Sequence, residues 1–530
     1  MLPDQTHRAA SAPEAAEPGL ANRPGLAKSP GMRSGSAALG GVLLSAAAFA
    51  EPSAVPSQSE GAAPAAVAAP APAPSRIYSR GYTTYVWVEP RKRGQKLGYV
   101  RVGTSVALRS TEPVVGEGCA AGFYPVKPYG FVCLDATSTL DAGERYVRGL
   151  ALAVPSDAML PFRFALSNGT PMYTRLPSRA EWEPRERFLG APGTHAKLSW
   201  GNRGHEQLAG ASPGEPSAAV PFFLADGGSM SSEKPLGLVR RHIPNGSMLA
   251  YTSSFEHEGR TFLLSTDGTV VPADRVRGFR ESSFEGVELG SGLELPLVWI
   301  RKQPAPKLRR AADGSLAETG ESWPLRGHVA LDPGAALVED DGRSYLVTAE
   351  RDAQGEPLFI AEAKATLVRP RDTLPIGVTE DDKWVHVSIT KGALVAYEGR
   401  RAVFATLVSP GAGGVPMRGK DPVKMSTTPL GVFRVTYKHR AATMSPEKGE
   451  NRKFWIADVP YTQYFDAPFA LHTAYWHENF GEGMSAGCVN LSPRDGRRLF
   501  GWTDPKVPEG WNGAGAGGVN GKGTFVVIER

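Results

Sequence analysis

The sequence predicts a mostly β fold divided into several domains. At roughly 150 residues per domain, a chain of 530 residues corresponds to three or four units rather than one hydrophobic core. Glycine (61) and proline (45) together make up one residue in five, which indicates many turns and linkers. Between them run short apolar stretches, many of which alternate with polar residues, as in half-buried strands.

The composition is that of a folded protein without a strong charge. Hydrophobic residues make up 41% of the chain and charged residues 21%, which is ordinary for globular domains. The formal net charge of +5 is spread over the whole chain, and no Lys/Arg run is interleaved with aromatic residues. Nucleic acid is therefore not expected as a partner, whereas contact with an acidic polymer stays open.

The amino-terminal region is typical of an exported protein. Met32 and Arg33 form a basic start, and the apolar residues 37–50 follow and end in Ala-Phe-Ala. This is the pattern of a secretory signal peptide, and the run is shorter than the ~20 residues that a spanning helix needs. We interpret residues 1–50 as an export signal, with Met32 as a second candidate start; an Ala-rich disordered tail is the alternative. Residues 51–75 are rich in Pro and Ala and should form an extended linker.

Three β-rich regions follow the linker. Residues 76–144 contain short strands and resemble a small SH3-like module. Residues 145–292 form an uncharacterised β-rich region with a hairpin expected at Asp267-Gly268. Residues 293–369, with a second turn at Asp341-Gly342, are interpreted as another SH3-like module. No segment of this part is long and apolar enough to span a membrane.

The chain has three cysteines, an odd number. Cys119 and Cys133 lie 14 residues apart in one β-rich module, and export permits disulfides. We predict that they are bonded, which would contribute about 3 kcal/mol in the chain-entropy model; two separate buried thiols are the alternative. Cys488 is then the odd cysteine, and an odd cysteine in an exported chain suggests a reactive thiol.

The chemistry is concentrated around Cys488. A cysteine nucleophile needs a base that forms its thiolate and protonates the leaving amine. His472, which lies 16 positions earlier, is the candidate base. The nucleophile also needs backbone N–H donors for the oxyanion, and Gly487 just before it helps to present them.

These residues stand in a recognisable order. Residues 485–490, Ser-Ala-Gly-Cys-Val-Asn, together with the preceding His472, resemble the signature of the YkuD-type L,D-transpeptidases. Residues 426–433, Ser-Thr-Thr-Pro-Leu-Gly-Val-Phe, are similar to a hairpin motif of that family, and residues 523–528 are similar to its closing strand. The resemblance covers residues 382–530.

The resemblance implies a compact, mostly β catalytic domain that acts on the stem peptides of peptidoglycan. Cys488 would attack the carbonyl of the third stem residue and release the terminal D-Ala. The acyl group would then pass to the side-chain amine of a neighbouring stem, which gives a 3→3 crosslink. His472 would act as base and then as acid, oriented by a carbonyl at Thr473. No metal or organic cofactor is implied, and we expect a monomer in the periplasm or cell envelope.

The resemblance also suggests substrate-binding residues and includes one departure. Ala486 stands where the family usually has a histidine; His477 is a candidate to take over part of its work, or else a structural histidine. The substrate-binding candidates are Ser485, Asn490, Tyr464, His477 and Thr473. For Asn490 the alternative is a turn-capping role, and for Tyr464 it is packing.

Other functions remain as alternatives. One alternative belongs to a different class of protein, a wall-binding or scaffolding protein whose catalytic domain is degenerate. Ala486 would then be the first sign of that degeneration. Water as the acyl acceptor would make the enzyme an L,D-carboxypeptidase. Peptidases of the NlpC type place Cys before His, and sortases separate His and Cys much farther. A metal site is disfavoured because His472 and His477 do not share a helix face and no carboxylate has ligand spacing.

Overall fold

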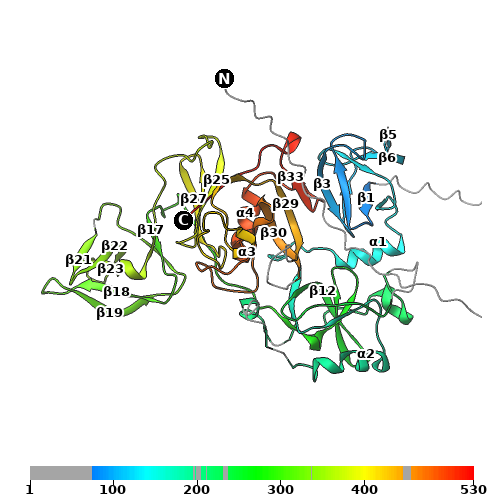
Figure 1. Ribbon diagram of the computed structural model, residues 1–530, viewed down its shortest axis with the longest axis horizontal. Coiled ribbons are helices and arrows are strands. Elements are labelled where there is room, and N and C mark those ends of the chain that lie inside the picture. Colours follow the sequence, from blue (N-terminus) through cyan, green and yellow to red (C-terminus); the bar gives the residue numbers. More distant parts are fainter. Residues whose placement is uncertain are drawn as a thin grey trace, which may run out of the picture. The chain divides into compact units, whose positions relative to one another are not determined.

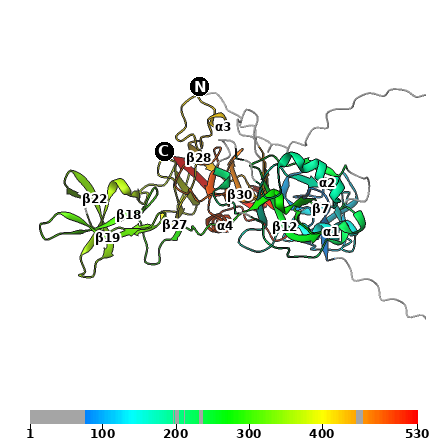
Figure 2. The ribbon, with the colours of Figure 1, turned by 90° about the horizontal axis from the view of Figure 1, so that it is seen from below.

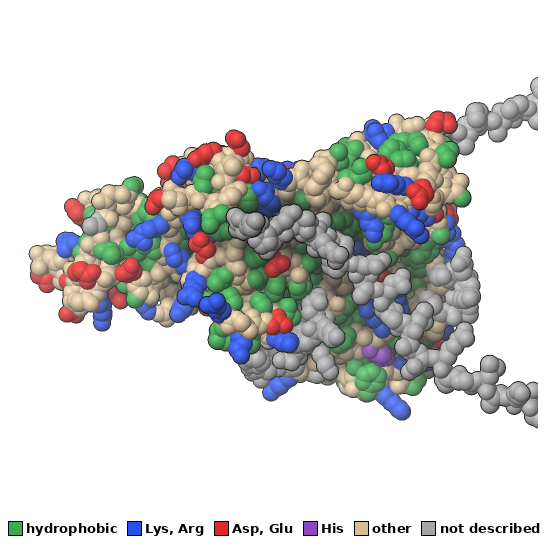
Figure 3. Space-filling model, turned by 45° about the horizontal axis from the view of Figure 1, so that its top comes forward, with side chains coloured by type: hydrophobic (Ala, Val, Ile, Leu, Met, Phe, Trp, Pro, Cys, Tyr) green, Lys and Arg blue, Asp and Glu red, His purple; other side chains and the backbone are tan. Residues whose placement is uncertain are grey.

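The computed structural model describes residues 75–194, 197–198, 204–210, 212–230, 237–335, 337–445 and 455–530. The predicted export signal and all but the last residue of the linker lie outside these ranges. Strands far outnumber helices, so the prediction of a mostly β protein is confirmed. Among the described residues, no helix is long and apolar enough to cross a membrane. Basic and acidic side chains are interspersed on the face drawn in Figure 3, in keeping with the small net charge.

The amino-terminal region consists of short antiparallel strands. They are β1 (Arg76–Ser79), β2 (Thr83–Trp87), β3 (Lys96–Arg101), β4 (Ser105–Ala107), β5 (Val114–Gly116), β6 (Cys119–Pro125), β7 (Phe131–Cys133) and β8 (Ser138–Thr139). β1 lies between β4 and β8, and β2 forms a hairpin with β3. Cys119 on β6 and Cys133 on β7 form a disulfide with 5.9 Å between their Cα atoms. The SH3-like character of this region stays a prediction.

The region from 145 to 292 is a second β-rich unit. Its helices are α1 (Arg145–Leu150) and α2 (Arg179–Glu186), and its strands are β9 (Arg163–Ser167), β10 (Pro171–Tyr173), β11 (Val239–His242), β12 (Met248–His257), β13 (Arg260–Ser265), β14 (Val270–Pro272), β15 (Val276–Gly278) and β16 (Val287–Glu288). The hairpin expected at Asp267-Gly268 is present and joins β13 to β14. Glu186 is fully buried and accepts hydrogen bonds from Arg260, Arg275 and the Tyr173 hydroxyl, which neutralises its charge.

Two small sheets make up the region from 293 to 369. The strands are β17 (Leu297–Trp299), β18 (Ala305–Arg310), β19 (Leu316–Trp323), β20 (His328–Ala330), β21 (Val338–Asp340), β22 (Arg343–Arg351), β23 (Pro357–Ala361) and β24 (Thr366–Val368). One sheet has the order β19-β18-β23-β22-β21 and the other β20-β17-β24. Strands β18, β19 and β22 of the larger sheet are labelled in Figure 2. Asp341 and Gly342, both with positive φ, form the predicted turn between β21 and β22. The SH3-like assignment stays a prediction here as well.

The carboxyl-terminal domain begins with a six-stranded sheet of order β16-β27-β26-β25-β34-β28. Its strands are β25 (Lys383–Ser388), β26 (Ala393–Glu398), β27 (Arg401–Leu407), β28 (Gly431–Arg434) and β34 (Phe525–Glu529), with the short helix α3 (Pro422–Met425) before β28. β25 runs parallel to β34, with Val385 opposite Val526 and Val387 opposite Ile528. The alternating apolar residues of β25 therefore face the core, as the period-2 pattern predicts.

A second set of strands completes this domain and continues into the amino-terminal region. It comprises β29 (Tyr437–Met444), β30 (Ile456–Asp466), β31 (Phe469–Thr473), β32 (Val489–Leu491) and β33 (Gly513–Gly515), together with helix α4 (Pro493–Trp502). β33 pairs with β29 on one side and with β3 on the other. The strands β2-β3-β33-β29-β30-β31-β32 thus form one continuous run of paired strands, part of which can be followed in Figure 1.

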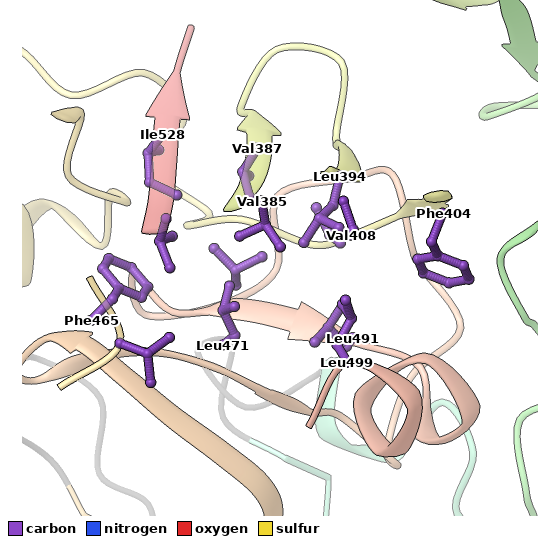
Figure 4. Packing of buried hydrophobic residues seen from close by; sticks show 14 of the residues in the cluster. Val385, Val387, Leu394, Phe404, Val408, Phe465, Leu471, Leu491, Leu499 and Ile528 are labelled. Carbon is purple, nitrogen blue, oxygen red and sulfur yellow. The ribbon is translucent and has the colours of Figure 1, made fainter. Parts of the chain in front are cut away.

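The core of the carboxyl-terminal domain lies between its two sheets. Figure 4 shows Val385, Val387 and Ile528 pointing toward Leu471 and Leu491, and Leu499 of α4 packs against the same cluster. All six side chains are at most 1% exposed. Since burial of one such aliphatic side chain contributes roughly 1.5–3 kcal/mol, this cluster fixes β31 and β32 firmly from one side.

Candidate active site

The paired strands β31 and β32 position His472 and the segment that carries Cys488. They run parallel, with Leu471 opposite Val489 and His472 opposite Asn490. Since side chains alternate along a strand, His472 and Asn490 share a face. Leu471 and Val489 point the other way, into the core. Cys488 lies in the bend that directly precedes β32. The register thus brings the segment that carries the thiol next to the strand that carries the imidazole.

The imidazole of His472 is buried and oriented by the backbone. Its Nδ1 lies 3.0 Å from the carbonyl oxygen of Thr473, and the side chain is 3% exposed. Because a carbonyl can only accept, Nδ1 carries the proton and Nε2 keeps the basic lone pair. Burial lowers the pKa of His472 to about 4, although the Thr473 carbonyl opposes the shift. The residue is therefore a neutral base at physiological pH.

Cys488 is the cysteine that forms no disulfide, and it is half-buried. Its Sγ lies 3.9 Å from the carbonyl oxygen of Pro468, in the turn between β30 and β31. The thiol therefore remains open to solvent in part, while the base on the neighbouring strand is shielded from it. A partly exposed thiol is one that a substrate can reach, as a cysteine nucleophile requires.

Gly487 has to be glycine in this turn. Its φ is +128°, and a Cβ built on it would lie 2.9 Å from the carbonyl oxygen of Thr427 and 2.5 Å from a ring carbon of Phe469. The Gly487 N–H donates to Ser485 Oγ over 3.0 Å, and Ser485 Oγ donates in turn to the carbonyl oxygen of Cys488 over 2.5 Å. Ser485 therefore stabilises the turn of residues 485–488, which we call the nucleophile turn. The Gly487 N–H donates its hydrogen bond within this turn.

His477 lies behind Asn490 rather than in the open part of the site. It is fully buried; its Nδ1 accepts the N–H of Asn479 over 3.2 Å, and its Nε2 lies 3.0 Å from the amide of Asn490. The Asn490 atom that contacts Nε2 is its amide nitrogen Nδ2. Burial lowers the pKa of His477 to about 3. Both ring nitrogens are engaged, which favours the structural role for His477 over that of a second base.

The remaining predicted residues lie at the edges of this arrangement. Thr473 contributes its backbone carbonyl, while Tyr464 on β30 is half-buried and stands opposite Ala470 of β31. Ala486 is half-buried within the turn. Trp476 also lies beside the base, with its ring centroid 6.0 Å from that of His472.

A second segment that sequence reasoning missed supports the nucleophile turn. Ser409 exchanges two backbone hydrogen bonds of 2.9 Å with Asn490. Gly411 forms a bridge with Ser485, and its N–H donates to Thr428 Oγ1 over 2.9 Å. The only signal in the sequence was a Gly-rich stretch after β27, which predicts a turn but not its partner.

Comparison with known proteins places this domain in a family. Residues 382–528 match the family YkuD, the L,D-transpeptidase catalytic domain. No curated protein matches the chain. The chain therefore carries a YkuD-type L,D-transpeptidase catalytic domain and is an enzyme of that class.

Solved structures of L,D-transpeptidases are also similar to parts of the chain. The catalytic domain of the Enterococcus faecium enzyme is 22% identical and covers 28% of this chain and 98% of its own, with a TM-score of 0.21. The Stackebrandtia nassauensis enzyme is 25% identical and covers 30% and 58%, with a TM-score of 0.19. The Mycobacterium smegmatis enzyme is 14% identical and covers 38% and 99%, with a TM-score of 0.21. The assignment rests on the family match.

Proposed function

We propose that the protein is an exported transpeptidase that crosslinks peptidoglycan through an acyl-enzyme on Cys488. The observation that supports the proposal is the parallel pairing of β31, which carries a buried, backbone-oriented imidazole, with β32, which begins directly after the half-exposed Cys488. The family acts on the cell wall, and peptidoglycan stem peptides are its substrates. Residues 1–50 would direct the chain to the periplasm or cell envelope.

The low pKa of His472 suggests how the first step proceeds. An imidazole with a pKa of about 4 does not hold a proton at neutral pH, so His472 Nε2 is ready to accept one. As Cys488 Sγ forms its bond to the carbonyl carbon of the third stem residue, its proton passes to His472 Nε2. The tetrahedral intermediate then collapses, the C–N bond to the terminal D-Ala breaks, and the imidazolium gives its proton to the leaving amine.

The second step reverses this order. A side-chain amine of a neighbouring stem attacks the thioester carbonyl, and His472 Nε2 takes its proton. The C–S bond breaks and Cys488 leaves as thiolate, which recovers the proton from His472. The products are a 3→3 crosslink and the free enzyme. Water in place of the amine would give a tripeptide, which is the carboxypeptidase alternative.

Mass analysis of muropeptides tests the proposal directly. The purified chain is incubated with disaccharide-tetrapeptides that carry a diamino acid at position three, and Cys488→Ser is the matched variant. The wild type should release D-Ala and form dimers linked between third residues, and Cys488→Ser should form none. Tripeptide without dimer would identify a carboxypeptidase. No product from either protein, together with a thiol that reacts no faster than a free cysteine, would favour the wall-binding or scaffolding alternative.

A further inference from the structure

One face of the continuous sheet carries a row of aromatic side chains that leads to the catalytic strands. Directly paired residues lie on the same face of a sheet, so the register can be followed from strand to strand. The successive pairs from β2 to β31 are Tyr85–Tyr99, Tyr99–Gly513, Gly515–Tyr437, Tyr437–Tyr464 and Tyr464–Ala470. His472, two residues after Ala470, is on this face as well. We call Tyr85, Tyr99, Tyr437, His439 and Tyr464 the aromatic face.

The rings of this face contact one another. The His439 ring centroid lies 4.6 Å from that of Tyr437, 5.6 Å from that of Tyr464 and 5.7 Å from that of Tyr99. Gly513 has no side chain, and a Cβ there would lie 2.6 Å from a ring carbon of Tyr99 and 2.9 Å from one of Tyr437. The two tyrosine rings therefore spread over the glycine strand β33 and make the aromatic face continuous across it.

The aromatic face is half-buried, whereas the reverse of the sheet is closed. All five of its side chains are intermediate in exposure. On the reverse, Val86, Val100 and Ala514 belong to the amino-terminal core, and α4 packs on β30 and β31. The tyrosines are thus on the more exposed side of these strands, while Ala470 and His472 at the catalytic end of the same face are buried.

Side chains at both ends of the strands limit the aromatic face. At one end, Trp87 is buried against the disulfide of Cys119 and Cys133, beside Tyr85. At the other end, the guanidinium of Arg101 lies 5.1 Å from the ring centroid of Phe162 in the region 145–292. These contacts limit the aromatic face at strands β2 and β3.

We propose that the aromatic face is a glycan-binding subsite, which holds the amino-sugar chain to which the donor stem peptide is attached. The inference rests on the proposed function and extends its site. Tyrosine rings offer flat apolar surfaces to the C–H faces of sugar rings. The Tyr99 hydroxyl is bonded to His439 Nδ1 over 3.0 Å and to Asn512 Nδ2 over 2.5 Å, so the ring of Tyr99 is the part that would contact the sugar. Lys96, whose Nζ lies 3.9 Å from the ring centroid of Tyr85, continues the face at its far end.

Length decides between sugar and peptide as the occupant. Strands are ~4.8 Å apart, so β30 lies about 10 Å from β32, which Cys488 precedes, and β2 lies about 29 Å from it. The three stem residues between the acylated carbonyl and the sugar span at most about 10–11 Å when extended. A stem bound at Cys488 and lying across the strands therefore ends near Tyr464. The part of the face beyond it, from Tyr437 to Tyr85, would meet the glycan.

Binding of a sugar-only probe tests the subsite separately from catalysis. The full chain carrying Cys488→Ala, which cannot react, is titrated with the β-1,4-linked hexamer of N-acetylglucosamine by calorimetry. We expect saturable binding that Tyr85→Ala weakens about 2- to 10-fold, the range for one aromatic contact. Tyr85→Leu keeps an apolar side chain in place and should weaken binding similarly without loss of fold. Phe188→Ala removes an aromatic ring that is 66% exposed in another region and should leave binding unchanged.

A kinetic comparison provides the second readout. In the wild type, kcat/KM for a glycan-linked stem should exceed that for the free tetrapeptide, and Tyr85→Leu should reduce this ratio. The subsite is overturned if the hexamer does not bind, if Phe188→Ala weakens binding as much as Tyr85→Leu does, or if only free tetrapeptide binds at Tyr85. Hexamer binding without any peptide transfer would leave the subsite in place and reject the proposed function instead.

Discussion

Arg101 on β3 and Asp458 on β30 form a buried, bidentate ion pair between the amino-terminal region and the catalytic domain. Nη1 lies 2.5 Å from Oδ1 and Nη2 lies 3.0 Å from Oδ2, and Thr266 donates a further hydrogen bond of 2.6 Å to Oδ2. The two charged side chains are only 11% and 5% exposed. The ion pair attaches β3 to the catalytic domain. The pairing of β3 with β33 attaches it to the same domain.

Removal of one partner of this pair should be strongly destabilising. Asp458→Ala leaves the Arg101 guanidinium buried without its counter-charge, which typically costs about 3–5 kcal/mol. Urea unfolding should show a large fall in the midpoint. Glu380→Ala, which breaks the exposed pair with Arg400, is the matched control and should cost less than about 1 kcal/mol. Equal effects of the two variants would show that the Arg101–Asp458 pair does not join the regions.

Gly487→Ala should remove activity through the shape of the turn. The methyl group would collide with the Thr427 carbonyl and with Phe469, and the positive φ would be strained. A displacement of the Cys488 thiol by about 1 Å can cost on the order of 100-fold in rate. Acyl-enzyme formation measured by intact mass should slow by about this factor. Gly414→Ala, in the neighbouring loop where a Cβ meets nothing within 4 Å, is the control for backbone strain alone.

The pH dependence of the reaction should reveal the buried base. His472 is active only as neutral imidazole, so kcat/KM should rise with pH through the pKa of about 4 and not through the ordinary 6.5. The acid limb measured in the free enzyme would then lie near pH 4. An acid limb near 6.5 would mean that the imidazole is solvated when it reacts.

The same burial should make the fold sensitive to acid. His439 and His472 have pKa values lowered to about 4, and His477 to about 3, all through desolvation. Because the unfolded chain binds these protons from pH 6.5 downward and the folded chain does not, stability is full above pH 6.5 and is lost as the pH falls toward 4. Asp495 acts the other way, since burial raises its pKa to about 6 and its stabilising contribution fades as the pH rises through 6. Thermal unfolding should show a net decline in Tm between pH 6.5 and 4 that His439→Leu reduces.

Local features of this fold could be predicted from the sequence, whereas long-range pairings could not. The alternation of Val385 and Val387 and the Asp341-Gly342 turn depend on neighbours in the chain, so period and turn chemistry suffice. The pairing of β3 with β33 joins residues more than 400 positions apart, and no local pattern in either strand specifies it. Likewise, Arg101 gives no sign in the sequence that its partner is Asp458.

The residues of the candidate site likewise fall into those that the sequence predicts and those that it does not. Cys488, His472 and Gly487 could be chosen because a reactive thiol needs a base and a permissive turn, and the family motif fixes their order. The role of His477 could not be chosen, because it depends on the Asn479 N–H and the Asn490 amide reaching its two nitrogens. The backbone contacts that Ser409 and Gly411 make with the nucleophile turn could not be predicted either, because these residues come from a segment about 80 residues earlier.

The last prediction separates a catalytic histidine from a positioning one. His472→Ala removes the base and proton donor and should lower kcat by about 10²–10⁴-fold. His477→Ala should cost less, about 10- to 100-fold, because it only loosens the Asn490 amide beside the nucleophile turn. Asn490→Ala should cost about the same, and the double variant should be no worse than either single one, since the two act through one contact. Acyl-enzyme formation by intact mass and the acid limb of kcat/KM are measured for each variant. If His477→Ala is as inactive as His472→Ala, or moves the acid limb, then His477 performs part of the role of the histidine that the family usually has at the position of Ala486.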